Sequence, residues 1–408
     1  MKRYQWMGIM LSLVLLLCSC GTDKEVEKKA GESTSTPSAT ASVTPLISED
    51  EAFSEAEKIV KTMTIEQKVG QMFLVDLLQL DASPSVDGTA YKATDSMKQA
   101  IIDYHLGGVY LTKENIKSQK QTKKLVQNLQ ASVVSGSALY VAVEEDGGGE
   151  NSISAKVEDL KDTGYVTPKE MGQNMTANQI YESGKTIAGE LTKIGINLNL
   201  APVADLASDQ NPSYAMRCLG SDADGVADLL DDFVSGMREG GLSVTLKTFP
   251  GIGNVSADVT ESIAENTDSL MTIRDTNFVP YASGIQAGAD CVMVSNATYS
   301  KLTVKKVPAF MSQDIVTKLL REELGFDGIV MTSPLNDNVI ENNYTNEFAV
   351  VEAVKAGCDL IVLPGNFKEC YEALITAVEE GRIDEKVINT SVRRILQNKI
   401  QRGILVLE

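Results

Sequence analysis

The stretch Lys247-Thr248-Phe249-Pro250-Gly251-Ile252-Gly253 is the part of the chain that says most about its fold. It follows an apolar, β-branched run over 242–246 and breaks at a proline and two glycines, a pattern that predicts a strand opening into a loop. The same loop carries Asp258 and Thr260. Barrel enzymes place their working groups at this end of their strands, so we expect a functional site here.

Strand-like and helix-like runs alternate along the chain from residue 49 onward. Amphipathic stretches such as 176–194, with Ile180, Ile187, Leu191 and Ile194 at helical spacing, separate the strands. Eight strands alternating with helices predict an α/β protein, a TIM-type (β/α)8 barrel forming a single domain over 49–408. A doubly wound open sheet is the alternative, but no glycine-rich phosphate loop opens the first helix. The expected strands are 72–77, 107–111, 139–143, 196–203, 243–249, 291–294, 328–332 and 360–363.

The N-terminus predicts export. A positive start, Met1-Lys2-Arg3, precedes an apolar core over 7–17 that is too short for an ordinary spanning helix. The sequence Leu17-Cys18-Ser19-Cys20 resembles a bacterial lipobox, which implies a signal peptide over 1–19 and a lipid on Cys20. A plain signal peptide cleaved nearby is the alternative. Residues 20–48 are rich in Ser, Thr, Ala, Lys and Glu and predict a disordered tether. We therefore expect an extracytoplasmic protein, lipid-anchored to the cell membrane.

The composition excludes some classes of protein. A formal net charge of −19 argues against nucleic-acid binding, which needs a basic face. Six cysteines are too few and too scattered for a disulfide framework, so Cys218, Cys291, Cys358 and Cys370 are expected to be small buried residues.

Several stretches together resemble glycoside hydrolase family 3, and specifically its single-domain β-N-acetylglucosaminidase (β-N-acetylhexosaminidase) branch. That branch has Lys-His-Phe-Pro-Gly-His-Gly at 247–253, followed by a loop with an Asp-x-His dyad. It also has counterparts of 63–73, of the Asn-containing run 196–203 and of 216–221, whose Arg217 matches an arginine that helps to hold the sugar. The resemblance covers 50–405 and implies a barrel that descends from sugar-cleaving enzymes.

The two catalytic positions that the resemblance implies are both replaced. The family's nucleophilic aspartate, directly after the strand at 328–332, corresponds to Ser333, and the acid/base histidine of the dyad corresponds to Thr260, with Asp258 as its partner. A serine without an adjacent base is a poor nucleophile near neutral pH. The chain's one histidine, His105, leads into the second strand and is expected to be structural. A histidine-dependent mechanism is therefore excluded by composition.

Carboxylates elsewhere leave open a rebuilt site. Asp258 and Glu261 are expected to be solvated loop residues, although burial could raise the pKa of either to that of a general acid. Asp337 lies four residues beyond Ser333, and we expect it to lie away from the site unless its loop folds back.

The sugar-holding positions are partly retained. Glu144-Glu145-Asp146-Gly147-Gly148-Gly149 stands where the family has Asp-Gln-Glu-Gly-Gly-Arg, and Asn296 stands where it has a histidine. Arg217, Lys247, Glu144 and Asp146 are the candidates for substrate binding. Alternatively, the two cations pair with lumen carboxylates such as Glu144 or Asp205. We expect no cofactor and no metal, although the acidic cluster could hold a hard ion in an unrelated role.

Two functions remain. The first is a catalytically impaired or inactive surface lipoprotein that binds N-acetylglucosamine-containing cell-wall glycan, a muropeptide or a protein partner through the barrel mouth. The alternative is an active β-N-acetylhexosaminidase-type glycosidase whose carboxylate site has been rebuilt.

Overall fold

The computed structural model describes residues 47–133, 137–148, 153–155 and 165–407. The expected signal peptide, Cys20 and the tether up to residue 46 lie outside the described residues, as does Gly149. None of the helices in the described part of the chain has the length and apolar character needed to cross a membrane.

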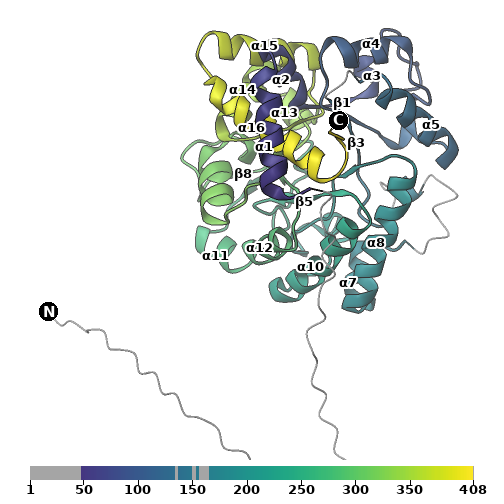
Figure 1. Cartoon of the computed structure of the whole chain (residues 1–408). Helices are drawn as coiled ribbons and strands as arrows, with labels where there is room; N and C mark the ends of the chain where they lie inside the picture. The colour runs from purple at the N-terminus through teal and green to yellow at the C-terminus, as the bar shows by residue number, and fades with distance from the viewer. Residues whose placement is uncertain (1–46, 134–136, 149–152, 156–164, 408) are drawn as a thin grey trace, which may run out of the picture. The chain divides into compact units, whose positions relative to one another are not determined.

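Eight parallel strands form the centre of the molecule (Figure 1). Their order in the sheet is β10-β1-β2-β3-β4-β5-β7-β9. A parallel bridge between Met331 and Leu360 joins the two outer members, and Thr332 N donates to Leu360 O at 3.1 Å, so the sheet closes on itself. The predicted (β/α)8 barrel is confirmed. The strands are β1 (Phe73–Asp76), β2 (Gly108–Tyr110), β3 (Tyr140–Val143), β4 (Leu198–Asn199), β5 (Ser243–Phe249), β7 (Cys291–Val294), β9 (Ile329–Thr332) and β10 (Ile361–Val362).

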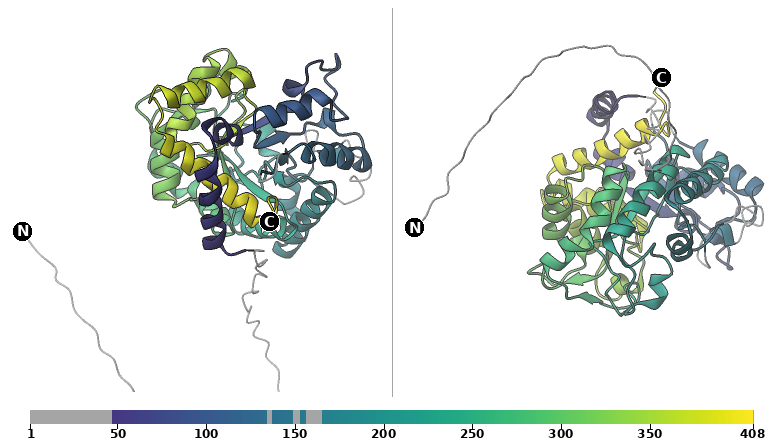
Figure 2. Two further views of the ribbon diagram at one scale, coloured as in Figure 1. Left: turned by 45° about the horizontal axis from the view of Figure 1, so that its top comes forward. Right: turned by 90° about the horizontal axis from the view of Figure 1, so that it is seen from below.

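Helices surround these strands, as both views in Figure 2 show. The predicted helix at 176–194 is α8, with Ile180, Ile187 and Leu191 buried. The longer helices are α1 (Glu49–Thr62), α2 (Ile65–Gln71), α4 (Asp95–Asp103), α5 (Gln119–Gln130), α7 (Pro168–Asn174), α8 (Ala177–Lys193), α10 (Ala223–Glu239), α11 (Leu270–Asp275), α12 (Phe278–Gln286), α14 (Asn346–Ala356), α15 (Phe367–Glu379) and α16 (Glu385–Gln401), with a π-helical segment at Asp314–Glu323. Short helices are α3 (Leu77–Leu80), α9 (Pro212–Ala215) and α13 (Asn338–Glu341).

The N-terminal and C-terminal helices of the barrel lie side by side. Helix α1 packs along α16, drawn in purple and yellow in Figure 2, and Arg393 of α16 lies over the ring of Phe53 of α1 at 4.4 Å. After α1 ends, Thr64 and Gln67 form a reciprocal capping box at the N-terminus of α2, which fixes where this second helix begins.

Two details of the strands differ from the expectation. The fourth strand is regular only over Leu198–Asn199, although 196–203 was expected. The following residues still meet β5 through an isolated parallel bridge between Val203 and Lys247, whereas Pro202 has no N–H to donate. A separate parallel pair, β6 (Glu265–Asn266) with β8 (Thr298–Tyr299), forms between the loops that follow β5 and β7. Strands of two residues carry too little periodicity to be predicted.

The end of the barrel where the strands begin, called the floor here, is closed by internal hydrogen bonds. The fully buried Lys399 of α16 donates from Nζ to Gln71 Oε1 at 2.9 Å, Gly107 O at 2.9 Å and Ala138 O at 2.7 Å. The carbonyl of His105 accepts from Gln71 Nε2 at 2.7 Å, which places the single histidine at this end. The floor is therefore held together by structural contacts.

Candidate functional site

A cavity of about 610 Å³ opens at the other end of the barrel, called the mouth here, where the strands end. This volume falls within the usual range for small-molecule sites. Its lining includes residues at or just after the ends of several strands, namely Tyr110, Glu144, Lys247, Asn296, Ser333 and Leu363. The position is the one at which TIM barrels carry their binding sites.

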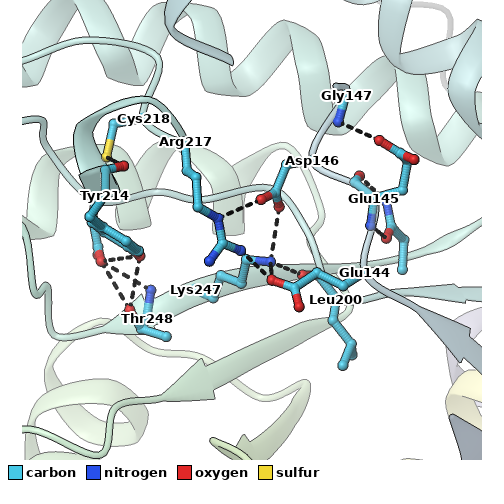
Figure 3. A network of polar contacts seen from close by, with 12 residues as sticks. Glu144, Glu145, Asp146, Gly147, Leu200, Tyr214, Arg217, Cys218, Lys247 and Thr248 are labelled. Atoms are coloured by element: carbon cyan, nitrogen blue, oxygen red, sulfur yellow. Dashed lines mark hydrogen bonds and ion pairs between the residues drawn. The ribbon is translucent and has the colours of Figure 1, made fainter. Parts of the chain in front are cut away.

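The segment after β3 presents its acidic side chains in two directions. Asn199 of β4 brackets the backbone of Glu145, accepting from its N and donating to its O at 2.9 Å each. The carboxylate of Glu145 then turns away to accept from Gly147 N and Ser154 N, both at 2.9 Å. Burial raises the pKa of Glu145 to about 7. Glu144 and Asp146 face the opposite way, toward two cations (Figure 3).

Glu144, Asp146, Arg217 and Lys247 form one charge cluster. Lys247 Nζ lies 2.7 Å from Glu144 Oε1 and 2.9 Å from Asp146 Oδ1 and also donates to Leu200 O. Arg217 pairs through Nε with Asp146 Oδ2 at 2.7 Å and through Nη2 with Glu144. The prediction that the two cations pair with lumen carboxylates is confirmed for Glu144, whereas Asp205 has other partners.

The electrostatics of the cluster favour its charged form. Burial alone would raise the pKa of Asp146, but Arg217 and Lys247 outweigh it and leave that pKa at about 2. Burial likewise opposes ionisation of Glu144, yet Lys247 and Arg217 lower its pKa. Asp146 is behind the two cations and outside the cavity lining, whereas Glu144 and Arg217 are 35% and 31% exposed and line it. The exposed pair is therefore the part of the cluster that a ligand reaches.

The two positions that differ from the family's Lys-His-Phe-Pro-Gly-His-Gly pattern surround a buried carboxylate. Asp205 Oδ2 accepts from Thr248 Oγ1 at 3.0 Å and from Ile252 N at 3.2 Å. Tyr214 and Tyr281 donate their hydroxyls to Asp205 at 2.8 and 2.9 Å. Burial raises the pKa of Asp205, although these donors act in the opposite direction.

Gly251 explains why the Phe-Pro-Gly turn of this stretch is retained. Its φ is +118°, and a Cβ at this position would come within 1.8 Å of Asn277 Nδ2. Any other residue would be strained and would displace Asn277. This part of the motif is thus required by packing, independent of any chemistry in the cavity.

Ser333, which the sequence resemblance aligns with the family's nucleophile, is 4% exposed and lines the cavity. Its hydroxyl donates to Val294 O at 2.9 Å, and so does its backbone N–H. A hydroxyl whose hydrogen bond goes to a backbone carbonyl has no base to remove its proton in this arrangement.

Thr260 and Asp258 also line the cavity, as the dyad positions predict. Asp258 Oδ1 accepts from Thr260 N at 2.9 Å and from Thr260 Oγ1 at 2.7 Å. Asp258 thus orients Thr260 as it would orient a histidine. A threonine hydroxyl, however, does not gain and lose a proton near neutral pH as an imidazole does.

Asp337 corrects an expectation: it lies in the cavity lining and not away from it. The loop before it is folded back, because Leu335 N donates to Val362 O at 3.0 Å and Asn336 N to Leu363 O at 2.9 Å. Asp337 then directly precedes α13 and accepts from Asn296 Nδ2 at 2.7 Å. One sequence signal existed: Asp337 lies only five residues beyond the end of β9, and this short connection keeps it near the mouth.

The protonation of Asp337 is unusual. Burial first, and then the nearby negative charges of Asp258, Glu144 and Glu261, raise its pKa to about 7. A carboxyl with this pKa has the range of a general acid. Glu261 itself is exposed, outside the cavity lining, and accepts from Asn338 Nδ2 at 2.8 Å.

Two aromatic side chains of the cavity were missed by sequence reasoning. Tyr110 lies at the end of β2, and Tyr214 stacks near Arg217, whose guanidinium lies 5.7 Å from the ring centre. Tyr110 is in a strand and Tyr214 in the short helix α9, and neither is part of a motif, so only their position after folding distinguishes them. Among the described residues, no group of three or more His, Cys, Asp and Glu side chains is placed to hold a metal ion.

The parallel barrel and its charged mouth define the class of the protein. The family model described as the glycosyl hydrolase family 3 N-terminal domain matches residues 64–398, so the chain belongs to this family.

Its relatives include "Beta-hexosaminidase A" of Pseudoalteromonas piscicida, 26% identical over 369 residues, which cover 83% of this chain and 61% of the relative. A family 3 β-N-acetylglucosaminidase from Paenibacillus sp. str. FPU-7 superposes with a TM-score of 0.75 at 29% identity, covering 85% of this chain and 64% of that one. A β-N-acetylhexosaminidase from Beutenbergia cavernae superposes with a TM-score of 0.71 at 28% identity, covering 83% and 98%. The chain thus spans less than two thirds of the first two relatives.

Proposed function

We propose that this protein binds N-acetylglucosamine-containing glycan at the barrel mouth and does not cleave it by the covalent route of a retaining glycosidase. One observation carries the proposal: the hydroxyl of Ser333, which the sequence resemblance aligns with the nucleophile, donates to Val294 O at 2.9 Å. Retaining hydrolysis requires a carboxylate there that attacks the sugar, and a second group that protonates the leaving oxygen.

The charge cluster supports ligand binding. Arg217 uses Nε and Nη2 for carboxylates, which leaves further N–H donors on a side chain that lines the cavity. Glu144 uses Oε1 for both cations, which leaves Oε2 to accept from a ligand hydroxyl. A sugar presents hydroxyl and amide groups that can bond to both. The names of the related enzymes suggest N-acetylglucosamine as the unit.

The cellular setting belongs to the same proposal. A lipid on Cys20 and the tether up to residue 48 would hold the barrel outside the membrane, where cell-wall glycan and muropeptides are the available ligands. A protein partner at the mouth is the other ligand class that the same surface could serve.

Calorimetric titration of the purified protein with N,N′-diacetylchitobiose tests the binding. We expect saturable binding, weakened about tenfold or more in Arg217→Met, because hydrogen bonds from a charged donor are lost. Arg274→Met is the matched control, since Arg274 pairs with Glu323 on the exterior. Absence of binding to the disaccharide and to a muropeptide mixture would refute the glycan proposal.

Asp337 favours a second candidate, weak glycoside hydrolysis with a rebuilt acid. Its pKa of about 7 and its place beside Asn296 in the cavity suit proton donation to a leaving group. The Thr260→His/Ser333→Asp double variant separates the candidates. Hydrolysis that appears only in the double variant supports a binding protein, whereas hydrolysis by the wild type supports the rebuilt site.

A further inference from the structure

A second polar cavity, of about 420 Å³, lies at the floor of the barrel. It includes Asp290, directly before β7, and Gly328, directly before β9, so it lies at the opposite end from the cavity at the mouth. The lining side chains that matter here are Glu49, Phe53, Arg238, Asp327, Arg393 and Arg394. We call it the arginine cavity. In a chain of net charge −19, three arginines at one cavity need an explanation.

Two of these arginines lack a carboxylate partner. Among the ion pairs within the described residues, neither Arg238 nor Arg393 takes part in one. Arg238 Nη1 donates to Ala287 O at 3.1 Å, and Arg393 Nη1 donates to Gln397 Oε1 at 2.7 Å. A guanidinium has five N–H donors, so most of those on both side chains remain available.

The third arginine is partly neutralised. Arg394 Nη1 lies 3.3 Å from Asp359 Oδ1, and its Nε is buried without an acceptor, as is the Nε of Arg238. Burial lowers the pKa of Arg238, and burial together with Arg394 lowers that of Arg393. Asp290 acts in the opposite direction on the pKa of Arg238, and Asp359, Glu57 and Asp327 do so on that of Arg393, but none of them outweighs these effects.

The acidic residues at the arginine cavity do not neutralise its arginines. Asp290 is matched by Arg402, with Nε–Oδ1 at 2.8 Å and Nη2–Oδ2 at 2.7 Å, and by Asn398 at 2.7 Å. Glu49 and Asp327 are exposed, and neither forms an ion pair with the three arginines. These two carboxylates form a negative rim. They weaken the attraction of the cavity for an anion, but they do not neutralise the arginines as a bound anion would.

The packing holds the guanidiniums in place. Arg238 lies against Gly288, where a Cβ would come within 1.9 Å of Nη1. Arg393 is held over the ring of Phe53 at 4.4 Å, which is a favourable cation–π distance. Helices α10 and α16 thus present fixed donors toward the same space, and ordered donors lose little entropy when a ligand binds.

We propose that the arginine cavity binds a phosphate group, carried by a soluble phosphorylated molecule or by a lipid headgroup. A phosphate suits arginines on two helices, because its several oxygens accept from more than one planar guanidinium at once. Glu49 and Phe53 of α1 also line the cavity, so the first helix of the barrel begins at its rim. A lipid-anchored protein would have headgroups within reach of this rim.

Two probes test the site on the full chain, produced with Cys20→Ser to prevent lipidation. Inorganic pyrophosphate in calorimetry serves as the soluble probe. Co-sedimentation with phosphatidylglycerol/phosphatidylcholine vesicles, compared with pure phosphatidylcholine, serves as the headgroup probe. We expect binding that weakens with added salt. The double variant Arg238→Gln/Arg393→Gln should bind about tenfold or more weakly. The control Arg274→Gln/Arg382→Gln, which removes two ion-paired surface arginines, should bind like the wild type.

The outcomes are distinct. Pyrophosphate binding alone assigns a soluble ligand, and binding of both probes assigns a headgroup as well; either supports the proposal if the Arg238/Arg393 variant loses it. A wild type that binds neither probe, or a folded double variant that binds as well as the wild type, overturns it. Should that variant fail to fold, the rim variant Glu49→Gln/Asp327→Asn decides, since tighter binding supports the site and unchanged binding overturns it.

Discussion

A buried lysine lies near the mouth of the barrel and another at its floor, and the two differ in their partners. Lys247, near the mouth and 4% exposed on its side chain, faces the carboxylates of Glu144 and Asp146 beside an open cavity. Lys399, at the floor, is fully buried and donates to Gln71, Gly107 and Ala138 without a carboxylate. Lys399 donates to neutral acceptors alone, which indicates a structural role at the floor. Lys247, in contrast, pairs with two carboxylates at the edge of a cavity, which is the arrangement expected of a ligand-binding site.

Of the replacements that test this difference between the two lysines, Lys247→Met is expected to lower the free energy of unfolding most. The replacement leaves buried Asp146 and neighbouring Glu144 with Arg217 as the one nearby cation of the cluster. We expect a loss of about 3–5 kcal/mol in the free energy of unfolding, because removing one partner leaves an uncompensated buried charge. Urea denaturation measures it, with exposed Lys61→Met as a control near zero. A loss below about 1 kcal/mol would mean that the cluster is not coupled as described.

The replacement at the floor, Lys399→Met, should cost less. It removes three hydrogen bonds to Gln71, Gly107 and Ala138 but leaves no charge behind. We expect a loss of about 2–3 kcal/mol from unsatisfied acceptors, and no change in glycan affinity of the folded protein. Urea denaturation and calorimetry on the same samples check both parts. Weakened glycan binding by a fully folded variant would show that the floor and the mouth are not independent.

A smaller effect, dependent on pH, is expected from Asp337→Asn at the mouth. The pKa of Asp337 is raised from 3.8 to about 7, so the folded state holds a proton that the unfolded state has released between these values. Its contribution to stability is therefore present below about pH 4 and is lost as the pH rises through 7. The asparagine removes this loss, so the variant should gain roughly 1–2 kcal/mol relative to the wild type between pH 5 and pH 8, after allowance for solvent screening.

Urea denaturation of both proteins at the two pH values measures this difference. Buried Glu145, whose pKa is also raised to about 7, titrates in both proteins and cancels in the comparison. Parallel pH profiles for the wild type and Asp337→Asn would show that Asp337 has an ordinary pKa and would remove the argument for an acid at the mouth.

Sequence reasoning was sufficient for the barrel, because apolar alternation and turn residues are local signals. All eight expected strands are present, and the clearest changes are in the fourth and the last strand, which are regular only over Leu198–Asn199 and Ile361–Val362. Local signals could not decide which of three consecutive acidic residues face the cavity. That choice depends on Asn199, which holds the backbone of Glu145 from the neighbouring strand.

The position of Asp337 shows the same limit. Its distance from Ser333 along the chain suggested a residue outside the site, but backbone hydrogen bonds to Val362 and Leu363 fold the loop over the end of β10. Such long-range bonds form only when the barrel closes, so the sequence shows the short distance between β9 and Asp337 but not the direction in which the loop folds. The pairing of Lys247 with Glu144, in contrast, could be stated as one of two alternatives from residue types alone.

Hydrolysis of 4-nitrophenyl N-acetyl-β-D-glucosaminide, followed with the wild type, Ser333→Ala and Asp337→Asn, tests the central claim most directly. If the mouth binds glycan without a working nucleophile, all three proteins release nitrophenol no faster than the buffer does. Turnover by the wild type that disappears in Asp337→Asn would contradict the claim and identify the barrel as an active glycosidase.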